Sequence, residues 1–173
     1  MEVLEAIKGR RSVRSFRPDP IPEKDLRTIL EAAVMAPSAG NCQPWEFVIV
    51  REEERKRRLA EAAHGQDFIA EAPVVVVVCA NVPRSSARDG RRGEGLYCIQ
   101  DTAAAVQNML LTAHSLGYGT CWIGSFEDEE VARVVEAPRG VRPVAVIPIG
   151  RPAEKPRAPA RIPLEKVCHE EHF

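Results

Sequence analysis

The chain has 173 residues, of which 45% are apolar and 28% charged, and a formal net charge of −1. A chain of this size and composition forms one globular domain with a real core. The small net charge excludes a global attraction to nucleic acid or to a membrane surface. No apolar run approaches the ~18 residues of a spanning helix, and five scattered cysteines without a CxxC pair indicate reduced thiols in a cytoplasmic protein.

Apolar periodicity, glycine and proline divide the chain into alternating helices and strands. The pattern predicts, in chain order, a helix over 3–9, a helix from 23 to Pro37, a strand over 46–50, a helix over 52–64, a strand over 74–79, a helix over 96–116, a strand over 119–123, a helix over 128–135 and a strand over 144–149. There is no internal repeat and no linker that would split the chain.

Two of these elements carry most of the information about assembly. The run 74–79 is continuously apolar and β-branched, which is typical of a central strand buried on both faces. The helix over 96–116 is apolar around most of its circumference. Such a helix must be buried on nearly all sides, so we expect a partner subunit to cover part of it.

Two other segments lack regular patterning. Residues 83–95 are poor in apolar side chains and rich in glycine and charge, and we predict a mobile surface loop there, with a lid as one role. Residues 152–173 contain repeated prolines, which disfavour a helix and favour an extended arm. The sequence therefore predicts a single domain over 1–173 that ends in an arm of about 152–173.

A dense basic cluster of Arg10, Arg11, Ser12 and Arg14 directly follows the first helix. A guanidinium group offers a planar fork of donors that matches a phosphate, and a serine hydroxyl adds a neutral donor. The cluster suits one phosphomonoester, although a solvated basic surface would contain the same residues.

Familiar motifs of other enzyme classes are absent. The chain has no GxxxxGK[ST], GxSxG or HExxH sequence, and its one GxG pair follows a helix and lacks the third glycine of the dinucleotide fingerprint. Cys168, His169 and His172 lie together near the chain end without a fourth ligand, so we predict no metal site. Cys42 and Cys121 remain open as nucleophiles, with buried structural cysteine the commoner case.

Four short motifs occur in order along nearly the whole chain: the basic cluster, Pro37–Trp45, Trp122–Phe126 and Gly150–Pro152. Each is weak alone, but in this order and spacing they resemble the FMN-dependent nitroreductase family. The resemblance implies an α+β fold of three α/β/α layers, with a mixed, mainly antiparallel sheet flanked by helices. It also implies an intertwined homodimer in which the arm contacts the partner subunit.

The resemblance also implies which residues hold FMN. Arg10 and Ser12, with Arg11 nearby, match the residues on the FMN phosphate, and Gly150 and Arg151 match a strand end that closes on it. Arg14 resembles the basic residue that faces the flavin N1 and C2 carbonyl.

The remaining matches concern the flavin ring. The loop residues Pro37, Ser38, Ala39 and Asn41 resemble a segment that reaches the flavin from the other subunit, and Gln66 resembles an amide against the pyrimidine ring. The turn Ile123, Gly124 and Ser125 resembles the backbone that donates an N–H to flavin N5. Many larger relatives carry glutamate in this turn, and the present chain has glycine.

The activity implied is NAD(P)H-driven, two-electron reduction of small molecules such as nitroaromatics or quinones by a ping-pong mechanism. Arg14, Gly124 and Ser125 are the predicted catalytic positions, and FMN supplies the redox chemistry. The partners expected are a second copy of the chain, NAD(P)H and a small-molecule acceptor, with no nucleic acid and no membrane. Alternatives are a non-enzymatic flavin-binding protein and a specialised relative, either flavin-consuming or dehalogenating.

Overall fold

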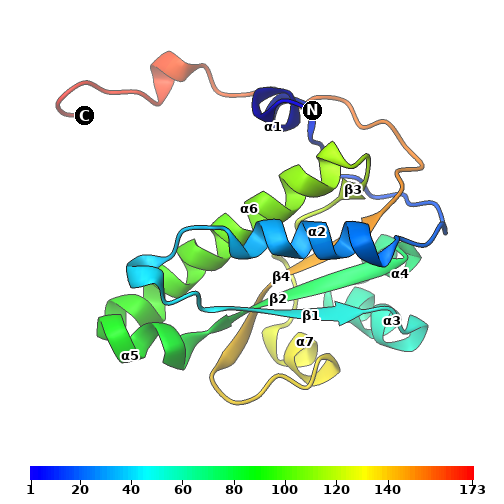
Figure 1. The fold of residues 1–173 in the computed structure, drawn as a ribbon, viewed down its shortest axis with the longest axis horizontal. Coiled ribbons are helices and arrows are strands. Elements are labelled where there is room, and N and C mark those ends of the chain that lie inside the picture. The colour runs from blue at the N-terminus through cyan, green and yellow to red at the C-terminus, as the bar shows by residue number, and fades with distance from the viewer.

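The computed structural model describes all 173 residues and is built around one four-stranded sheet (Figure 1). Its strands lie in the order β1-β2-β4-β3, and every neighbouring pair is antiparallel. Their bounds are Trp45–Val50 for β1, Val74–Asn81 for β2, Gly119–Thr120 for β3 and Val141–Gly150 for β4. The only parallel pairing is an isolated bridge between Ser12 and Thr120, so the sheet is mainly antiparallel, as expected.

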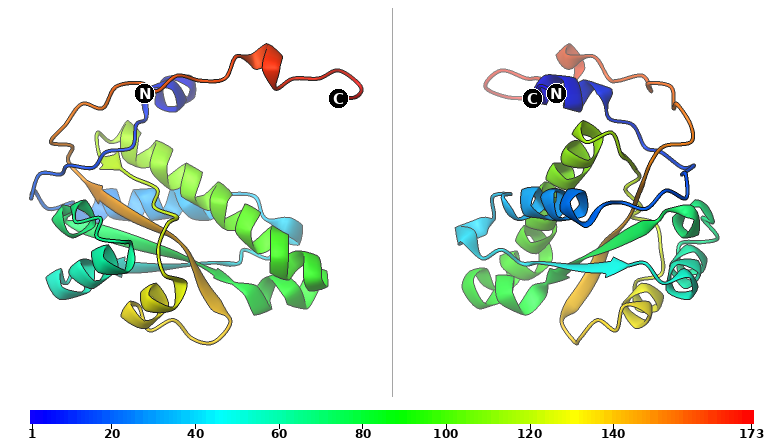
Figure 2. Two further views of the ribbon diagram at one scale, coloured as in Figure 1. Left: turned by 180° about the vertical axis from the view of Figure 1, so that it is seen from behind. Right: turned by 45° about the vertical axis from the view of Figure 1, so that its right-hand side comes forward.

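The two central strands, β2 and β4, separate two apolar cores. Val74, Val76 and Val78 of β2 point into one core, whereas the alternate residues Val75 and Val77 point into the other, because successive side chains of a strand face opposite ways. Helices α2 (Glu23–Val34) and α6 (Cys98–Ser115) cover the first face, and α3 (Glu53–Ala62), α4 (Phe68–Glu71) and α7 (Asp128–Val134) cover the second (Figures 1 and 2). The predicted three-layer α+β architecture is confirmed.

The segment predicted as a mobile loop over 83–95 is instead helical, and that prediction is wrong. It forms α5 (Val82–Arg92) followed by one π-helical turn, η2 (Gly93–Tyr97). The Asn81 side chain accepts a hydrogen bond from the Arg84 N–H, Pro83 occupies the first turn, and buried Ser85 donates to the Gly93 carbonyl. Capping and these local bonds stabilise a helix that has little apolar surface of its own.

One predicted strand is shorter than expected, and helix α6 is only partly covered within one chain. The strand predicted over 119–123 pairs regularly only at Gly119–Thr120, and Ile123 adds an isolated bridge to Val146. Helix α6 buries one side within the chain, while Ala103, Ala104 and Leu111 on its other side are only partly covered.

The two ends of the chain lie outside the three layers. Helix α1 (Val3–Gly9) buries only Ala6, and its apolar residues Val3, Leu4 and Ile7 are 68%, 65% and 50% exposed. The arm after β4 runs past α1 and away from the body, with one short 3₁₀ turn, η3 (Leu164–Lys166) (Figure 1). None of the helices combines the length and the hydropathy needed to cross a bilayer.

Candidate active site

The basic cluster lies in an extended stretch, residues 10–14, that runs along the end of the sheet. We call this stretch the basic segment. Ser12 bridges Thr120 of β3, and the Val13 N–H donates to the Thr120 carbonyl over 2.9 Å. Val13 is buried against Gly119, where a β-carbon would lie 2.8 Å from the valine side chain. The buried valine and the glycine opposite it hold the segment in place, so that its neighbours Ser12 and Arg14 line the surface.

The basic cluster faces a surface hollow of about 370 Å³ that is lined by five arginines, one serine and two prolines. Its lining residues are Arg10, Arg11, Ser12, Arg14, Pro156, Arg157, Pro159 and Arg161. We call this the arginine hollow. It includes no carboxylate, and none of its five guanidinium groups forms an ion pair within the chain. Burial, followed by the charges of Arg161 and Arg11, lowers the pKa of Arg10.

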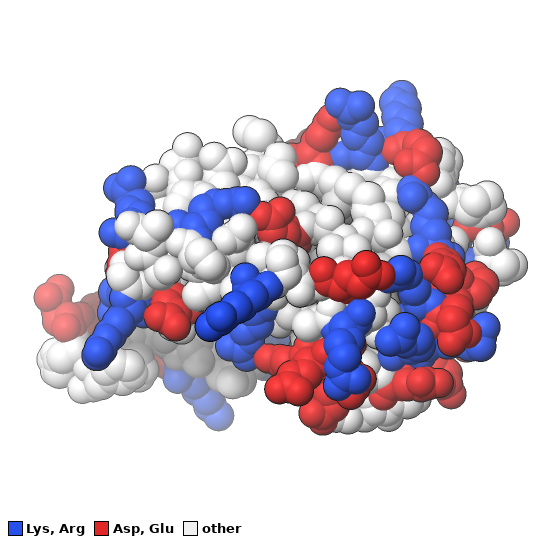
Figure 3. Space-filling model, turned by 90° about the horizontal axis from the view of Figure 1, so that it is seen from below, with Lys and Arg blue, Asp and Glu red and all other residues white.

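Many surface charges elsewhere are paired, whereas the arginine hollow gathers five guanidinium groups without one carboxylate. Along α3, Arg57 pairs with Glu54 over 2.9 Å and Lys56 pairs with Glu53 over 2.7 Å. Figure 3 shows Lys and Arg side chains lying beside Asp and Glu side chains over much of the face seen from below. An uncompensated cluster of guanidinium groups is the kind of site that binds a phosphate.

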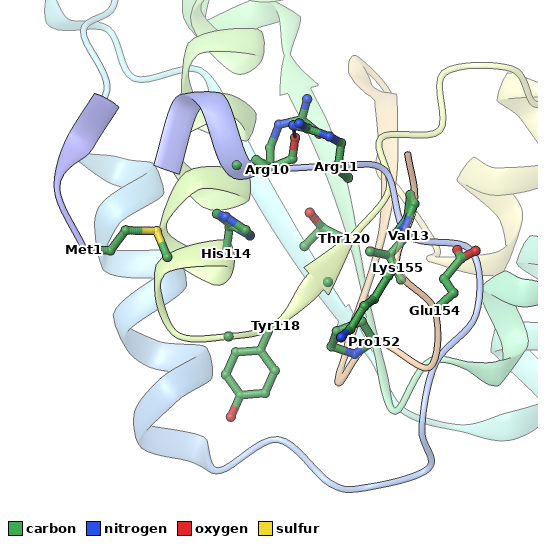
Figure 4. Close-up of a pocket in the computed structure, with 14 residues that line it drawn as sticks. Met1, Arg10, Arg11, Val13, His114, Tyr118, Thr120, Pro152, Glu154 and Lys155 are labelled. Atoms are coloured by element: carbon green, nitrogen blue, oxygen red, sulfur yellow. Dashed lines mark hydrogen bonds between the residues drawn. The ribbon is translucent and has the colours of Figure 1, made fainter. Parts of the chain in front are cut away.

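A second hollow, of about 380 Å³, adjoins the first and shares Arg10 and Arg11 with it (Figure 4). Helix α6 contributes His114, which packs so closely on α1 that a β-carbon at Gly9 would lie 2.7 Å from its Nε2. Burial, and then the charges of Arg10 and Arg11, lower the pKa of His114. The imidazole is therefore kept neutral beside the basic segment.

Gly150 and Arg151 lie next to the basic segment but not in the arginine hollow. The Arg17 N–H donates to the Arg151 carbonyl over 2.8 Å, and a β-carbon at Gly150 would lie 2.7 Å from Pro73. The Arg151 guanidinium stacks 4.3 Å from the Tyr118 ring and donates to the carbonyls at the end of α6. Its predicted contact with a phosphate would require the side chain to leave these partners, and this contact stays a prediction.

The turn after β3 offers free backbone donors. Ile123 is buried and exchanges hydrogen bonds of 3.1 and 3.0 Å with Val146. Gly124 and Ser125 are exposed, and neither N–H donates within the chain. Gln66 lies in the connection between α3 and α4, where its side chain donates to the Ala63 carbonyl over 2.9 Å. The turn can therefore donate a hydrogen bond to a ligand, and its predicted contact with flavin N5 stays a prediction.

The loop of Pro37, Ser38, Ala39 and Asn41 lies at the opposite end of the sheet. Trp45 pairs with Ala80 at one end of β2, whereas Val74, at the other end, pairs with Ile149 beside the basic segment. Eight residues of strand separate the two ends, or roughly 25 Å at about 3.3 Å per residue. One chain does not bring this loop to the arginine hollow.

A buried carboxylate that the sequence analysis did not assign holds this loop. Asp101 of α6 is 8% exposed, and its two oxygens accept from the Ala39 N–H over 3.1 and 3.2 Å. The Cys42 thiol also donates to it, over 3.7 Å. Burial raises the pKa of Cys42 and of Cys121, which keeps both thiols protonated and argues against a nucleophilic role.

Three comparisons with known proteins agree. The family model described as "Nitroreductase family" matches residues 7–66 and 62–151. A "Putative NADH dehydrogenase/NAD(P)H nitroreductase" of Methanothermobacter thermautotrophicus is 40% identical, over 96% of this chain and 88% of that protein. An "FMN reductase [NAD(P)H]" of Bacillus subtilis is 32% identical, over 99% of this chain and 74% of that protein. The structure of "NADPH:FMN oxidoreductase" from Vibrio harveyi, complexed with NAD⁺, superposes with a TM-score of 0.91 at 26% identity. The match covers 99% of this chain and 77% of that one.

Proposed function

The chain belongs to the nitroreductase family, and we propose that it is an FMN-dependent enzyme that uses NAD(P)H to reduce small molecules such as nitroaromatics or quinones by a ping-pong mechanism. Relatives named as NAD(P)H nitroreductases and FMN reductases support this activity. The arginine hollow is the observation within the chain that carries the proposal. Residues 1–173 act as a single domain, and five free cysteines support a cytoplasmic location.

The residues of the arginine hollow fit the phosphate of FMN. A phosphate monoester is a compact anion with three strong acceptor oxygens, and Arg10, Arg11 and the Ser12 hydroxyl present donors without a competing carboxylate. Because burial, and then the like charges of Arg161 and Arg11, lower the pKa of Arg10, a bound anion relieves an unfavourable arrangement. The ligand thereby contributes stability to the folded chain.

FMN, when bound, supplies the transfer of hydride equivalents between NAD(P)H and an acceptor. The protein contributes binding and electrostatics: Arg10 and Ser12 hold the phosphate, and Arg14 places positive charge next to them. The unused N–H groups of Gly124 and Ser125 are donors that need no rearrangement before a ligand arrives. Nothing in this arrangement requires a side-chain nucleophile, consistent with two protonated thiols.

The activity is tested by the purified protein and its steady-state kinetics. Heat-released flavin should run as FMN on chromatography, and NAD(P)H oxidation should require an added acceptor. Because donor and acceptor use the same site in turn, double-reciprocal plots at several acceptor concentrations should be parallel. A colourless protein that ignores added FMN would end the proposal, and intersecting lines would exclude the ping-pong part of it.

The proposed enzyme is a homodimer, and exposed apolar surface supports this. Besides α1, a hollow of about 450 Å³ follows the open edge of β1, lined by apolar residues of α2 and β1: Leu26, Leu30, Val34, Phe47 and Ile49. The arm exposes Ile162, Leu164, Val167 and Phe173. Apolar side chains of this kind and an unpaired strand edge are typical of surfaces that another chain covers.

A second copy of the chain would also complete the flavin site. The loop around Ala39 and the arginine hollow lie at opposite ends of the sheet in one chain. The loop of one copy reaches the hollow of the other if the two copies pack with the loop end of each against the hollow end of its partner. Light scattering at micromolar concentration should give the mass of a dimer. Deletion of residues 162–173 keeps Arg157 and Arg161 but removes the apolar end of the arm, and it should weaken the dimer. A monomeric mass for the full chain would refute the assembly.

A further inference from the structure

Helix α5 and the loop at Pro37–Gln43 form one connected unit. Arg84 of α5 donates from Nη1 to the Gln43 carbonyl over 2.8 Å and from Nη2 to the Glu46 carboxylate. Asn81, which caps α5, donates its side-chain amide to the same Glu46 oxygen over 3.0 Å. Hydrogen bonds at the point where the loop enters β1 therefore fix the position of α5 relative to the loop.

Arg88 lies one turn further along α5, against the backbone of this loop. A β-carbon at Gly40 would overlap the Arg88 guanidinium, so the glycine leaves room for it there. The Arg88 side chain is 60% exposed and donates no hydrogen bond within the chain. Its single ion pair is with Asp89, whose Oδ2 is 3.9 Å away and buried. The exposed side of the guanidinium is thus free to bind an anion.

The arginines that follow Arg88 are placed differently. Arg92 donates from Nε to the Tyr97 hydroxyl over 2.8 Å and stacks on the same ring. Arg91 lies beyond Gly90, whose φ of +54° interrupts the helix. Arg88 is therefore the arginine of α5 that combines free donors with a place on the loop.

A ligand for Arg88 follows from the proposed function, on which this inference rests. In the proposed dimer the loop of one chain reaches the flavin of the other, and NAD(P)H must approach that flavin. The dinucleotide carries a pyrophosphate, and NADPH carries one further phosphate. While FMN is bound, its own phosphate occupies the arginine hollow, so the phosphates of NAD(P)H require another cation.

We propose that Arg88 binds a phosphate of NAD(P)H at the flavin site of the partner subunit. A guanidinium group binds a phosphate through charge-assisted, bidentate hydrogen bonds. The contact is remote from the reacting nicotinamide, so it stabilises the bound substrate and the transition state equally. Its loss therefore raises KM and leaves kcat unchanged.

A dihydronicotinamide without phosphates is the matched substrate for the test. With FMN-loaded enzyme, Arg88→Ala should raise the KM for NAD(P)H roughly tenfold, the size of one charge-assisted contact, and leave the KM for N-benzyl-dihydronicotinamide unchanged. Arg88→Lys should recover part of the loss, because it keeps the charge but not the fork of donors. Arg58→Ala, at an exposed arginine of α3 without an ion pair, should change neither value.

Comparison of the two nucleotides identifies the phosphate. Equal losses with NADH and NADPH assign Arg88 to the pyrophosphate, whereas a loss with NADPH alone assigns it to the further phosphate. Calorimetric titration of the oxidised holoenzyme with NADP⁺ measures the same contact without turnover, and the Kd should rise by the same factor. Unchanged values of KM and Kd in Arg88→Ala, or an equal loss with the phosphate-free donor, would overturn the inference. If the FMN-loaded wild type oxidises neither donor, the proposed function itself has failed.

Mixed dimers test whether Arg88 acts across the interface. Chains carrying Arg10→Ala and chains carrying Arg88→Ala are coexpressed with different tags. The site with an intact Arg10 then takes its Arg88 from the other chain, so it should keep the wild-type KM for NAD(P)H. A tenfold higher KM at that site would place Arg88 at the flavin of its own chain and overturn the assignment to the partner subunit.

Discussion

The basic segment at Arg10–Arg14 and the loop at Pro37–Gln43 are both short polar stretches that were expected to meet FMN, but they are stabilised in opposite ways. The basic segment has its backbone fixed by Thr120 while its guanidinium groups lack any anionic partner. In the loop, the backbone N–H of Ala39 is bound by Asp101 and that of Gln43 by the Ser38 hydroxyl, over 3.0 Å. The segment needs a ligand for its charge balance, whereas the loop is preorganised by the chain itself.

The preorganised loop also has unusual backbone conformations. Gly40, Asn41 and Gln43 have φ values of +50°, +58° and +49°. Non-glycine residues in this region cost on the order of 1–3 kcal/mol each and persist only where the surroundings hold them. Asp101 provides that support from α6, so the comparison predicts that the two stretches respond to different perturbations.

The largest effect is expected from Arg10→Ala. Loss of one charge-assisted contact costs about 1.5–3 kcal/mol of binding free energy, so the Kd for FMN should rise roughly tenfold to hundredfold. Stability without FMN should be unchanged or slightly increased, because Arg10 is repelled by its neighbours. Fluorescence titration measures the Kd, and Arg58→Ala, an exposed arginine of α3 without an ion pair, is the control. Equal losses in both variants would place the site elsewhere.

Asp101→Ala should lower the stability of the protein and leave phosphate binding unchanged. It leaves the half-buried Ala39 N–H without its partner, which costs on the order of 1 kcal/mol of the free energy of unfolding, and it frees the loop from its unusual conformation. Urea unfolding measures the loss of stability. Faster hydrogen exchange at residues 39–43 would report the loosened loop. The affinity for inorganic phosphate should not change, because the arginine hollow is at the other end of the sheet.

Asp101→Asn is the matched control for this prediction. The amide keeps one acceptor oxygen for the Ala39 N–H and removes the buried charge, and burial already raises the pKa of Asp101. It should therefore retain most of the stability that the alanine variant loses. If the asparagine and alanine variants were equally unstable, the hydrogen bond to Ala39 would not be what holds the loop.

The smallest effect concerns His114, beside the basic segment. Its pKa is lowered by burial and by Arg10 and Arg11, so the unfolded chain takes up the proton first, and stability should fall as the pH drops through about 6.5. A phosphate at these arginines offsets their charge and should raise the pKa of His114. NMR titration with and without inorganic phosphate measures the change, and a pKa of His114 that phosphate does not move would contradict it.

The central strand and the two cores beside it were predictable because burial on both faces leaves a direct trace, the continuously apolar run from Val74 to Cys79. Helix α5 was not, because a cap at Asn81 and a buried Ser85 stabilise it without any apolar stripe. At the site, the order of the motifs predicted the basic segment and the free donors at Gly124 and Ser125. No pattern signals that the Ala39 loop lies at the far end of β2, since this depends on strand register.

Two contributors to the site were missed for related reasons. Asp101 is a single acidic residue on a long apolar helix, and its contact with Ala39 joins positions 62 residues apart. Arg157 and Arg161 lie in a proline-rich arm without periodicity, so nothing local shows where they point. An uncompensated positive charge next to repeated prolines was the only available signal in the sequence.

The most direct test asks whether one flavin site is built from two chains. Chains carrying Arg10→Ala and chains carrying Asp101→Ala are given different tags, coexpressed, and purified as mixed dimers. If the basic segment of one chain and the loop of the other form each site, every mixed dimer has one intact site and one doubly altered site. It should retain one FMN with wild-type affinity, although neither homodimer does. Mixed dimers with no site of wild-type affinity would show that both stretches act within one chain, which would contradict the account.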